Sequence, residues 1–265
     1  MCGNWLTRAF TSLGFQGWPT RMFSHSNGNA TKKKALIVVD VQNDFISGSL
    51  ALCNCPSKHK GEEVVPKINE LVELPFWDLV VYSKDWHPPN HISFVSNTHL
   101  FHPHMDNKCD LTNPCVFDHV IYDVDSTVVE QDLWPVHCLQ DSEGAEFHKD
   151  LKIVEGGVVV HKGLNPNIDS YSAFFDNGRR SETILQSVLR DNRISTVYVC
   201  GLATDVCVNF TTFDAHSLGF ETYVIEDCCR GVHEENIEKT FKDMKEAGIK
   251  VVTSEDVPKN KETQS

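Results

Sequence analysis

The sequence STVYVCGLATDVCVNFTTFDAHSLGF, residues 195–220, passes from a strand pattern to a helix pattern within a few positions. Its first part, 195–201, is a nearly continuous apolar run, which is typical of a strand buried on both faces of a sheet. Its second part, 204–220, has helical spacing and closes on Gly219, a residue type that commonly ends helices. A buried strand followed directly by a helix predicts one unit of a parallel α/β sheet.

The same alternation continues in both directions along the chain. Five more runs have the buried-strand pattern, at 35–40, 78–85, 156–162, 221–227 and 249–256. Helical patterns lie between several of them, at 62–74, 181–192 and 234–249. We therefore predict an α/β fold of Rossmann-like type, with a six-stranded, mostly parallel sheet and helices on both faces.

The chain divides into three segments by composition. No acidic residue occurs before Asp40, whereas the same stretch holds five Lys or Arg residues. We expect residues 1–33 to be a basic extension that is disordered or serves targeting. We expect a cytoplasmic protein. The mitochondrion is the alternative, because the composition of this extension resembles a mitochondrial presequence. Residues 34–255 form the domain, with an insertion at about 97–133 that fits no element, and 256–265 form a polar tail.

Charge and cysteine spacing exclude several classes of protein. The formal net charge is −13, which argues against a nucleic-acid partner because such a partner requires a basic face. No apolar run approaches 18 residues, so we expect no membrane partner. Ten cysteines are present without a single CxxC pair. Reduced thiols therefore explain them better than a disulfide framework, a redox protein or a zinc-storage protein.

Ionisable residues lie where several predicted strands end. Asp40, Asp85 and Lys162 each close a strand pattern, and Cys207 begins a helix six residues after Gly201. In an open α/β sheet the carboxyl ends of the strands border the ligand crevice. We therefore expect these side chains to meet in one site.

A thiol, an amine and a carboxylate in one site suggest nucleophilic catalysis. The helix start and Lys162 are expected to favour the thiolate of Cys207. Asp40 can accept the thiol proton and return it to a leaving amine. Small residues before Cys207 leave backbone N–H groups available to stabilise an oxyanion.

Five short motifs together resemble the nicotinamidases, which belong to the isochorismatase-like cysteine hydrolase superfamily. They occur in the order IVVDVQNDF, SKDWHPPNHISF, LWPVHC, VVHKG and GLATDVCV, and the resemblance covers about residues 34–255. It implies a catalytic triad of Asp40, Lys162 and Cys207. It also implies a cis Leu202–Ala203 peptide bond, with the N–H groups of Ala203 and Cys207 as oxyanion-hole donors.

A metal site is expected beside this triad. Asp85 and His87 are alternate residues of an extended segment, so their side chains point the same way. His137 is the third member, and the resemblance assigns the same three residues. One carboxylate and two imidazoles leave coordination positions open, as a catalytic metal requires. We expect one divalent ion, zinc in the first place and iron or manganese as alternatives. Whether His91 is a further ligand stays open.

The resemblance implies hydrolysis of nicotinamide to nicotinate and ammonia, through a thioester at Cys207, in NAD salvage. The residues that would wall the ring pocket are Phe45, Trp134 and Tyr171. Two alternatives remain: a cysteine hydrolase of the same superfamily acting on another small amide, and a relative that binds a small molecule without catalysis. Assembly into a homo-oligomer is also left open.

Overall fold

The structure is a computed structural model that describes residues 32–261. The predicted basic extension therefore lies outside the described residues, apart from Lys32 and Lys33, and so do the last four residues of the tail. Within the described part, the domain continues past residue 255. Val257 is buried, and the Nζ of Lys261 lies 2.7 Å from Oδ1 of Asp78.

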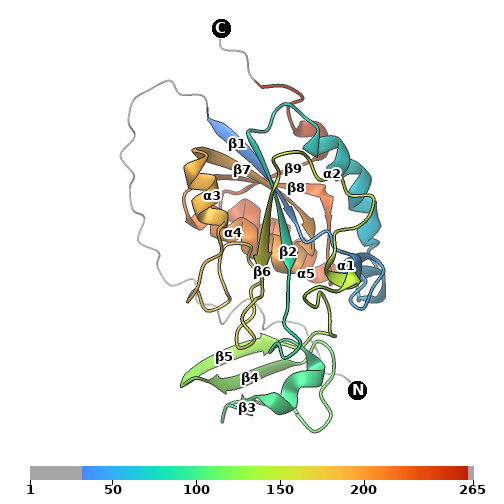
Figure 1. The fold of residues 1–265 in the computed structure, drawn as a ribbon, viewed down its shortest axis with the longest axis vertical. Coiled ribbons are helices and arrows are strands. Elements are labelled where there is room, and N and C mark those ends of the chain that lie inside the picture. Colours follow the sequence, from blue (N-terminus) through green and yellow to red (C-terminus); the bar gives the residue numbers. More distant parts are fainter. Residues whose placement is uncertain (1–31, 262–265) are drawn as a thin grey trace.

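Six parallel strands form the central sheet, as predicted. Their order across the sheet is β6-β2-β1-β7-β8-β9 (Figure 1). The strands are β1 (Lys33–Val39), β2 (Leu79–Asp85), β6 (Val158–Lys162), β7 (Ile194–Leu202), β8 (Glu221–Arg230) and β9 (Lys250–Val252). In β1 every residue from Ala35 to Val39 is fully buried. Burial on both faces is why this run contains apolar residues alone.

Helices cover both faces of the sheet, again as predicted. They are α1 (Asn43–Ile46), α2 (Val64–Val72), α3 (Leu185–Asp191), α4 (Asn209–Ser217) and α5 (Glu234–Glu246). Figure 1 shows α2 on one side of the sheet and α3 and α4 on the other. The third helix begins at Leu185 rather than at 181, because residues before it bond elsewhere. The Thr183 amide donates to the Phe174 carbonyl, and the Ser181 amide donates to Asp176.

The segment after β7 differs from the single regular helix that the sequence predicts. Residues Thr204–Val208 form a π-helical turn, and α4 follows it. The carbonyl of Ala203 accepts from the amides of both Val206 and Val208, each at 3.1 Å. Such wide turns are rare and often occur at functional sites. Here the turn contains Cys207.

The prediction that residues 97–133 fit no element was wrong. They contain β3 (His102–Pro103), β4 (His119–Val124) and β5 (Thr127–Asp132), which form a small antiparallel sheet. Asp125 and Ser126 join β4 to β5 with φ values of 50° and 63°. Positive φ at both positions is what a two-residue hairpin turn needs, and the usual Asn-Gly signal is absent.

The small sheet has an apolar core of its own. Its buried members are Ile92, Val120, Tyr122, Val124, Val129 and Leu133. Figure 1 shows this sheet next to the carboxyl ends of β2 and β6. The insertion therefore lies at the same end of the molecule as the predicted site. No helix among residues 32–261 is long and apolar enough to cross a membrane.

The close contact of β7 with β1 leads to a first prediction. Gly201 has a φ of 119°, and a Cβ there would overlap the backbone of Val39. We expect Gly201→Ala to lower the free energy of unfolding by about 3 kcal/mol or more, through backbone strain and overpacking. Gly219→Ala is the matched control, since Gly219 has a φ of 84° with no atom within 4 Å of the added Cβ. It should cost about 1 to 2 kcal/mol. Urea unfolding measures both, and equal losses would contradict the prediction.

Candidate active site

The residues predicted at the strand ends meet at one point, the ammonium group of Lys162. Its Nζ lies 2.5 Å from Oδ1 of Asp85, 3.0 Å from Oδ2 of Asp40 and 3.3 Å from Sγ of Cys207. Lys162 and Asp85 are register partners on β6 and β2, so the sheet itself sets their contact. The Ser170 carbonyl also accepts from Lys162, at 2.9 Å. All four predicted side chains are buried.

Opposite charges hold Lys162 and Asp85 ionised despite their burial. Burial alone would lower the pKa of Lys162, but Asp40 and Asp85 raise it well above its usual value. Burial alone would raise the pKa of Asp85, but Lys162 and His87 lower it below its usual range. The group therefore contains a permanent cation next to a permanent anion.

Asp40 is less firmly ionised than Asp85. It directly follows β1 with a φ of 48°, and its Oδ1 accepts a 2.6 Å hydrogen bond from the Ser83 hydroxyl. Burial raises its pKa to about 6, against the lowering effect of Lys162. A carboxylate with a pKa near neutrality can both accept and return a proton, as acid–base catalysis requires.

The pKa of Cys207 is shifted in the direction opposite to the one that the helix start and Lys162 were expected to favour. Burial raises the pKa of its thiol well above the usual value, and Lys162 offsets this only in part. Asp40 and Asp85 raise the pKa further because they are negative. The thiol is therefore protonated at rest, and its proton has to leave as the sulfur reacts.

Asp85, His87 and His137 form a compact group that could hold a divalent metal ion. Their ligand atoms all lie within 4.8 Å of one another. The Nε2 atoms of His87 and His137 are 3.6 Å and 3.9 Å from Oδ2 of Asp85. Each imidazole bonds a backbone carbonyl through Nδ1, that of Gly163 at 2.9 Å and that of Pro135 at 2.8 Å. These contacts place the proton on Nδ1 and leave the lone pair of Nε2 facing the carboxylate, as in metal-binding histidines.

His91 lies beside this group on the other side of His87. The two rings stack with centroids 4.0 Å apart. The Nε2 of His91 lies 3.9 Å from Oδ1 of Asp169 and has no hydrogen-bond partner among residues 32–261. His91, His87 and Asp169 form a second close group. His91 and the predicted metal group thus have His87 in common.

Two residues that the sequence analysis did not assign support the metal group. The side chain of Gln42 donates to the Asp85 carbonyl at 2.8 Å and accepts from the Asp85 amide at 2.9 Å. Oδ2 of Asp44 accepts from the amide of Cys138, next to His137, at 2.7 Å. Both belong to the motif VQNDF. Their position between Asp40 and Phe45 was the sequence signal that could have identified them as site residues.

A small cavity borders Cys207 and the metal group. The predicted pocket residues Phe45, Trp134 and Tyr171 line it, and so does Ala203, the predicted oxyanion-hole residue. The Leu202–Ala203 peptide bond is cis, as the resemblance implies. Further lining residues were not predicted: Leu50, Leu52, Asp169, Val206 and Val232. Leu50 and Leu52 come from the loop after α1, and Asp169 from the loop after β6.

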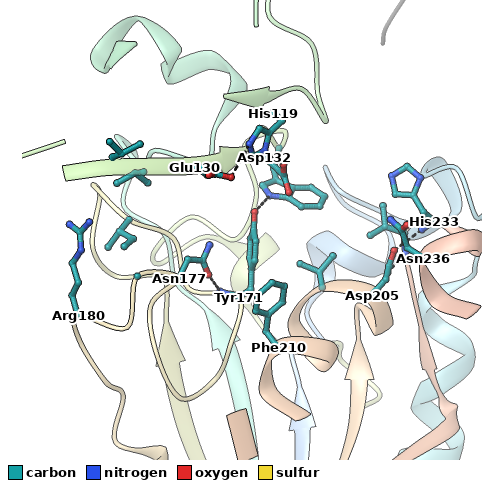
Figure 2. Close-up of a pocket in the computed structure, with 17 residues that line it drawn as sticks. His119, Glu130, Asp132, Tyr171, Asn177, Arg180, Asp205, Phe210, His233 and Asn236 are labelled. Atoms are coloured by element: carbon teal, nitrogen blue, oxygen red, sulfur yellow. Dashed lines mark hydrogen bonds and ion pairs between the residues drawn. The ribbon is translucent and has the colours of Figure 1, made fainter. Parts of the chain in front are cut away.

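A larger cavity of about 240 Å³ lies next to the small one (Figure 2). The two share the lining residues Trp134, Tyr171, Val206 and Val232. Figure 2 shows Tyr171 and Phe210 in the middle of its wall, with His119 and Asp132 of the hairpin on one side. On the other side, Asp205 accepts from the amides of Val232 and His233 at 2.8 Å and 2.9 Å. The inserted hairpin is therefore part of the surroundings of the active site.

Comparison with known proteins gives matches over most of the chain. The isochorismatase domain family matches residues 34–256. The nicotinamidase of Escherichia coli strain K12 is 40% identical over 231 residues, which cover 84% of this chain and 96% of that protein.

Two solved structures are also similar. The zinc complex of the Pyrococcus horikoshii pyrazinamidase is 33% identical, covers 83% of this chain and 99% of its own, and has a TM-score of 0.61. The yeast nicotinamidase bound to the inhibitor nicotinaldehyde is 30% identical, with the same two coverages and a TM-score of 0.71.

The metal group leads to a second prediction. The purified protein should contain about one divalent ion per chain, because one carboxylate and two oriented imidazoles match a catalytic metal site. His87→Ala and His137→Ala should each retain less than about a tenth of it, since two remaining ligands hold an ion poorly. His119→Ala, on the hairpin surface, is the control and should keep the full content. Elemental analysis decides, and full metal content in both ligand variants would contradict the assignment.

Proposed function

We propose that this chain, which belongs to the isochorismatase family, hydrolyses nicotinamide to nicotinate and ammonia. One observation carries the proposal: a buried Asp40–Lys162–Cys207 cluster shares an aromatic-walled cavity with the Asp85–His87–His137 group. The similarity to nicotinamidases over more than four fifths of the chain supports it. The yeast relative binds nicotinaldehyde, which differs from nicotinamide at the reacting carbonyl group.

The cavity suits a flat ring with one carboxamide arm. The rings of Phe45, Trp134 and Tyr171 supply aromatic walls, and the thiol of Cys207 lies beside them. A divalent ion held by Asp85, His87 and His137, zinc in the first place as in the Pyrococcus relative, would supply a Lewis acid that binds a neutral ring nitrogen. The residues Asp85, His87 and His137 would hold this ion, and the cavity beside them would orient the ring with its carboxamide near Cys207.

In the first half-reaction, Cys207 becomes acylated. Sγ attacks the carboxamide carbon while Asp40 accepts the thiol proton. The Lys162 ammonium lies close to both groups and stabilises the negative charge as it passes between them. The N–H groups of Ala203 and Cys207 stabilise the tetrahedral oxyanion. Asp40 then returns the proton to the nitrogen, the C–N bond breaks, and ammonia leaves a nicotinoyl thioester on Cys207.

In the second half-reaction, water hydrolyses the thioester. Asp40, again a carboxylate, accepts a proton from the attacking water, and the same N–H groups stabilise the second oxyanion. The C–S bond breaks, the proton passes from Asp40 to Sγ, and nicotinic acid leaves and loses its remaining acidic proton to the solvent. The pKa of Asp40, about 6, suits a group that alternates between base and acid.

The nucleophile can be tested directly. Cys207→Ala should lower kcat by more than about a thousandfold, because no covalent intermediate can form. The variant should fold and bind metal like the wild type. Cys53→Ala is the control, since Cys53 is exposed and lies outside the cavity lining. Ammonia release from nicotinamide measures both variants. Residual activity above the stated limit for Cys207→Ala would refute the nucleophile.

The base has its own test. Asp40→Asn keeps the size of the side chain and removes the proton acceptor, so acylation should slow by about a hundredfold or more. Ser83→Ala, which removes only the hydroxyl that bonds Asp40, should have a much smaller effect. Single-turnover measurement of ammonia release separates acylation from hydrolysis. A normal acylation rate in the Asn variant would rule out Asp40 as the base.

Substrate choice separates nicotinamide hydrolysis from a general amidase activity. Benzamide has the same carboxamide but no ring nitrogen, so nothing directs its ring toward the Asp85–His87–His137 group. We expect its kcat/KM to be lower than that of nicotinamide by about a hundredfold or more. Equal turnover of the two compounds would favour the alternative, a hydrolase of other small amides. No turnover of either, with binding retained, would favour a non-catalytic relative.

A further inference from the structure

The inserted hairpin carries a buried polar residue whose position is hard to explain by packing alone. Gln131 lies in β5 and is 1% exposed. Val129, two positions earlier on the same face of the strand, belongs to the apolar core of the hairpin. Burying an amide at such a position costs free energy unless its hydrogen bonds are made. Its contacts therefore indicate what the side chain does.

The Nε2 of Gln131 lies within hydrogen-bond distance of three acceptors. They are the carbonyl of Asp132 at 2.8 Å, the hydroxyl of Tyr171 at 3.2 Å and Oδ2 of Asp169 at 3.3 Å. A carbonyl and a carboxylate can only accept, so Nε2 is the amide atom that faces them, and its two hydrogens are shared among the three acceptors, while Oε1 has no hydrogen-bond partner among residues 32–261. One side chain of the insertion thus holds two residues of the loop that follows β6.

Those two residues are part of the cavity beside Cys207. Asp169 and Tyr171 both line it, together with Trp134. The indole Nε1 of Trp134 also donates to the Tyr171 hydroxyl, at 3.3 Å. The other side of the Tyr171 ring packs against Phe210, with centroids 5.2 Å apart (Figure 2). The hydroxyl contacts therefore decide how the ring of Tyr171 is held against the cavity.

Asp169 depends on the same amide. The carboxylate is 3% exposed, and its Oδ1 accepts from the Ser170 amide at 2.7 Å. Gln131 is the side-chain donor that the described structure gives its Oδ2. A buried carboxylate that loses a donor reorients or draws in water, because an unsatisfied buried charge is costly. Either change would alter a wall of the cavity.

We propose that Gln131 is a positioning residue for the substrate cavity, through which the inserted hairpin holds Asp169 and Tyr171 in place. The proposal rests on the proposed function, since it concerns the cavity that receives the amide. Gln131 does not line this cavity and so acts through its two partners. The insertion is in this view a part of the binding site.

The test compares Gln131→Leu with Val120→Ala. Leucine keeps the approximate shape of the side chain and removes both polar atoms. Val120 is the register partner of Gln131 on β4 and belongs to the hairpin core. Its side chain has no polar atom and so cannot hydrogen-bond to the three acceptors. Val120→Ala therefore loosens the hairpin and leaves the network intact.

Gln131→Leu should raise the KM for nicotinamide about tenfold and change kcat less than threefold, as expected for lost ground-state binding. Val120→Ala should leave KM within twofold of the wild type.

A double-mutant cycle with Tyr171→Phe tests whether Gln131 acts through its partner. Removing the hydroxyl by Tyr171→Phe should raise KM. Gln131→Leu should then raise KM by a smaller factor in the Tyr171→Phe variant than it does in the wild type. The proposal is overturned if Gln131→Leu leaves KM within twofold, if Val120→Ala raises KM equally, or if the two effects multiply fully.

A spectroscopic readout separates this proposal from the proposed function. Trp134 donates to the Tyr171 hydroxyl that Gln131 holds, so its emission reports on the network without any substrate. The contribution of Trp134 is obtained as the difference between spectra with and without Trp134→Phe. It should shift in Gln131→Leu and stay unchanged in Val120→Ala. An inactive wild type would refute nicotinamide hydrolysis alone, whereas an absent shift would refute the positioning role alone.

Discussion

The burial of the Lys162 ammonium is the constraint on which the rest of the site depends. A buried cation is stable only with close counter-charges, and here two carboxylates supply them. The two carboxylates leave an excess of negative charge, and Asp85 turns its second oxygen toward two imidazoles. A further cation is therefore best stabilised between this oxygen and the two imidazoles. The nucleophile and the metal group are thus coupled through one shared carboxylate.

The parallel sheet brings these side chains close together. Neighbouring strands bring Asp85 and Lys162 into register, and Asp40 follows the adjacent strand at the same edge. On the other side of β1, Gly201 approaches the backbone of Val39 so closely that no side chain fits, which brings Ala203 and Cys207 next to the carboxylates. The chemistry of the cavity is therefore set by backbone positions, and loops contribute mainly its walls.

Those walls come from parts of the chain that are far apart in sequence. The loop after α1 contributes Leu50 and Leu52, the loop after β6 contributes Asp169 and Tyr171, and the segment after β5 contributes Trp134. Gln131 connects two of these parts. The burial of Cys207, Lys162 and Asp40 suits a reaction with a protonated thiol, because excluding water strengthens the interaction among these three groups.

The sequence by itself determined the six strands of the central sheet, their parallel arrangement and the residues at their ends. Apolar runs and helix stops are local patterns, and the convergence of strand ends in an α/β sheet is a general rule, so Asp40, Lys162 and Cys207 could be placed together without coordinates. Only the tertiary structure decided the roles of Gln42, Asp44 and Gln131, whose partners lie about 40 to 100 residues away. It also decided that Cys207 is a thiol at rest, because the pKa depends on burial, and burial is a property of the assembled fold. The β4–β5 hairpin was missed because its turn uses Asp-Ser with positive φ, a choice that neighbouring strands stabilise and local propensity does not favour.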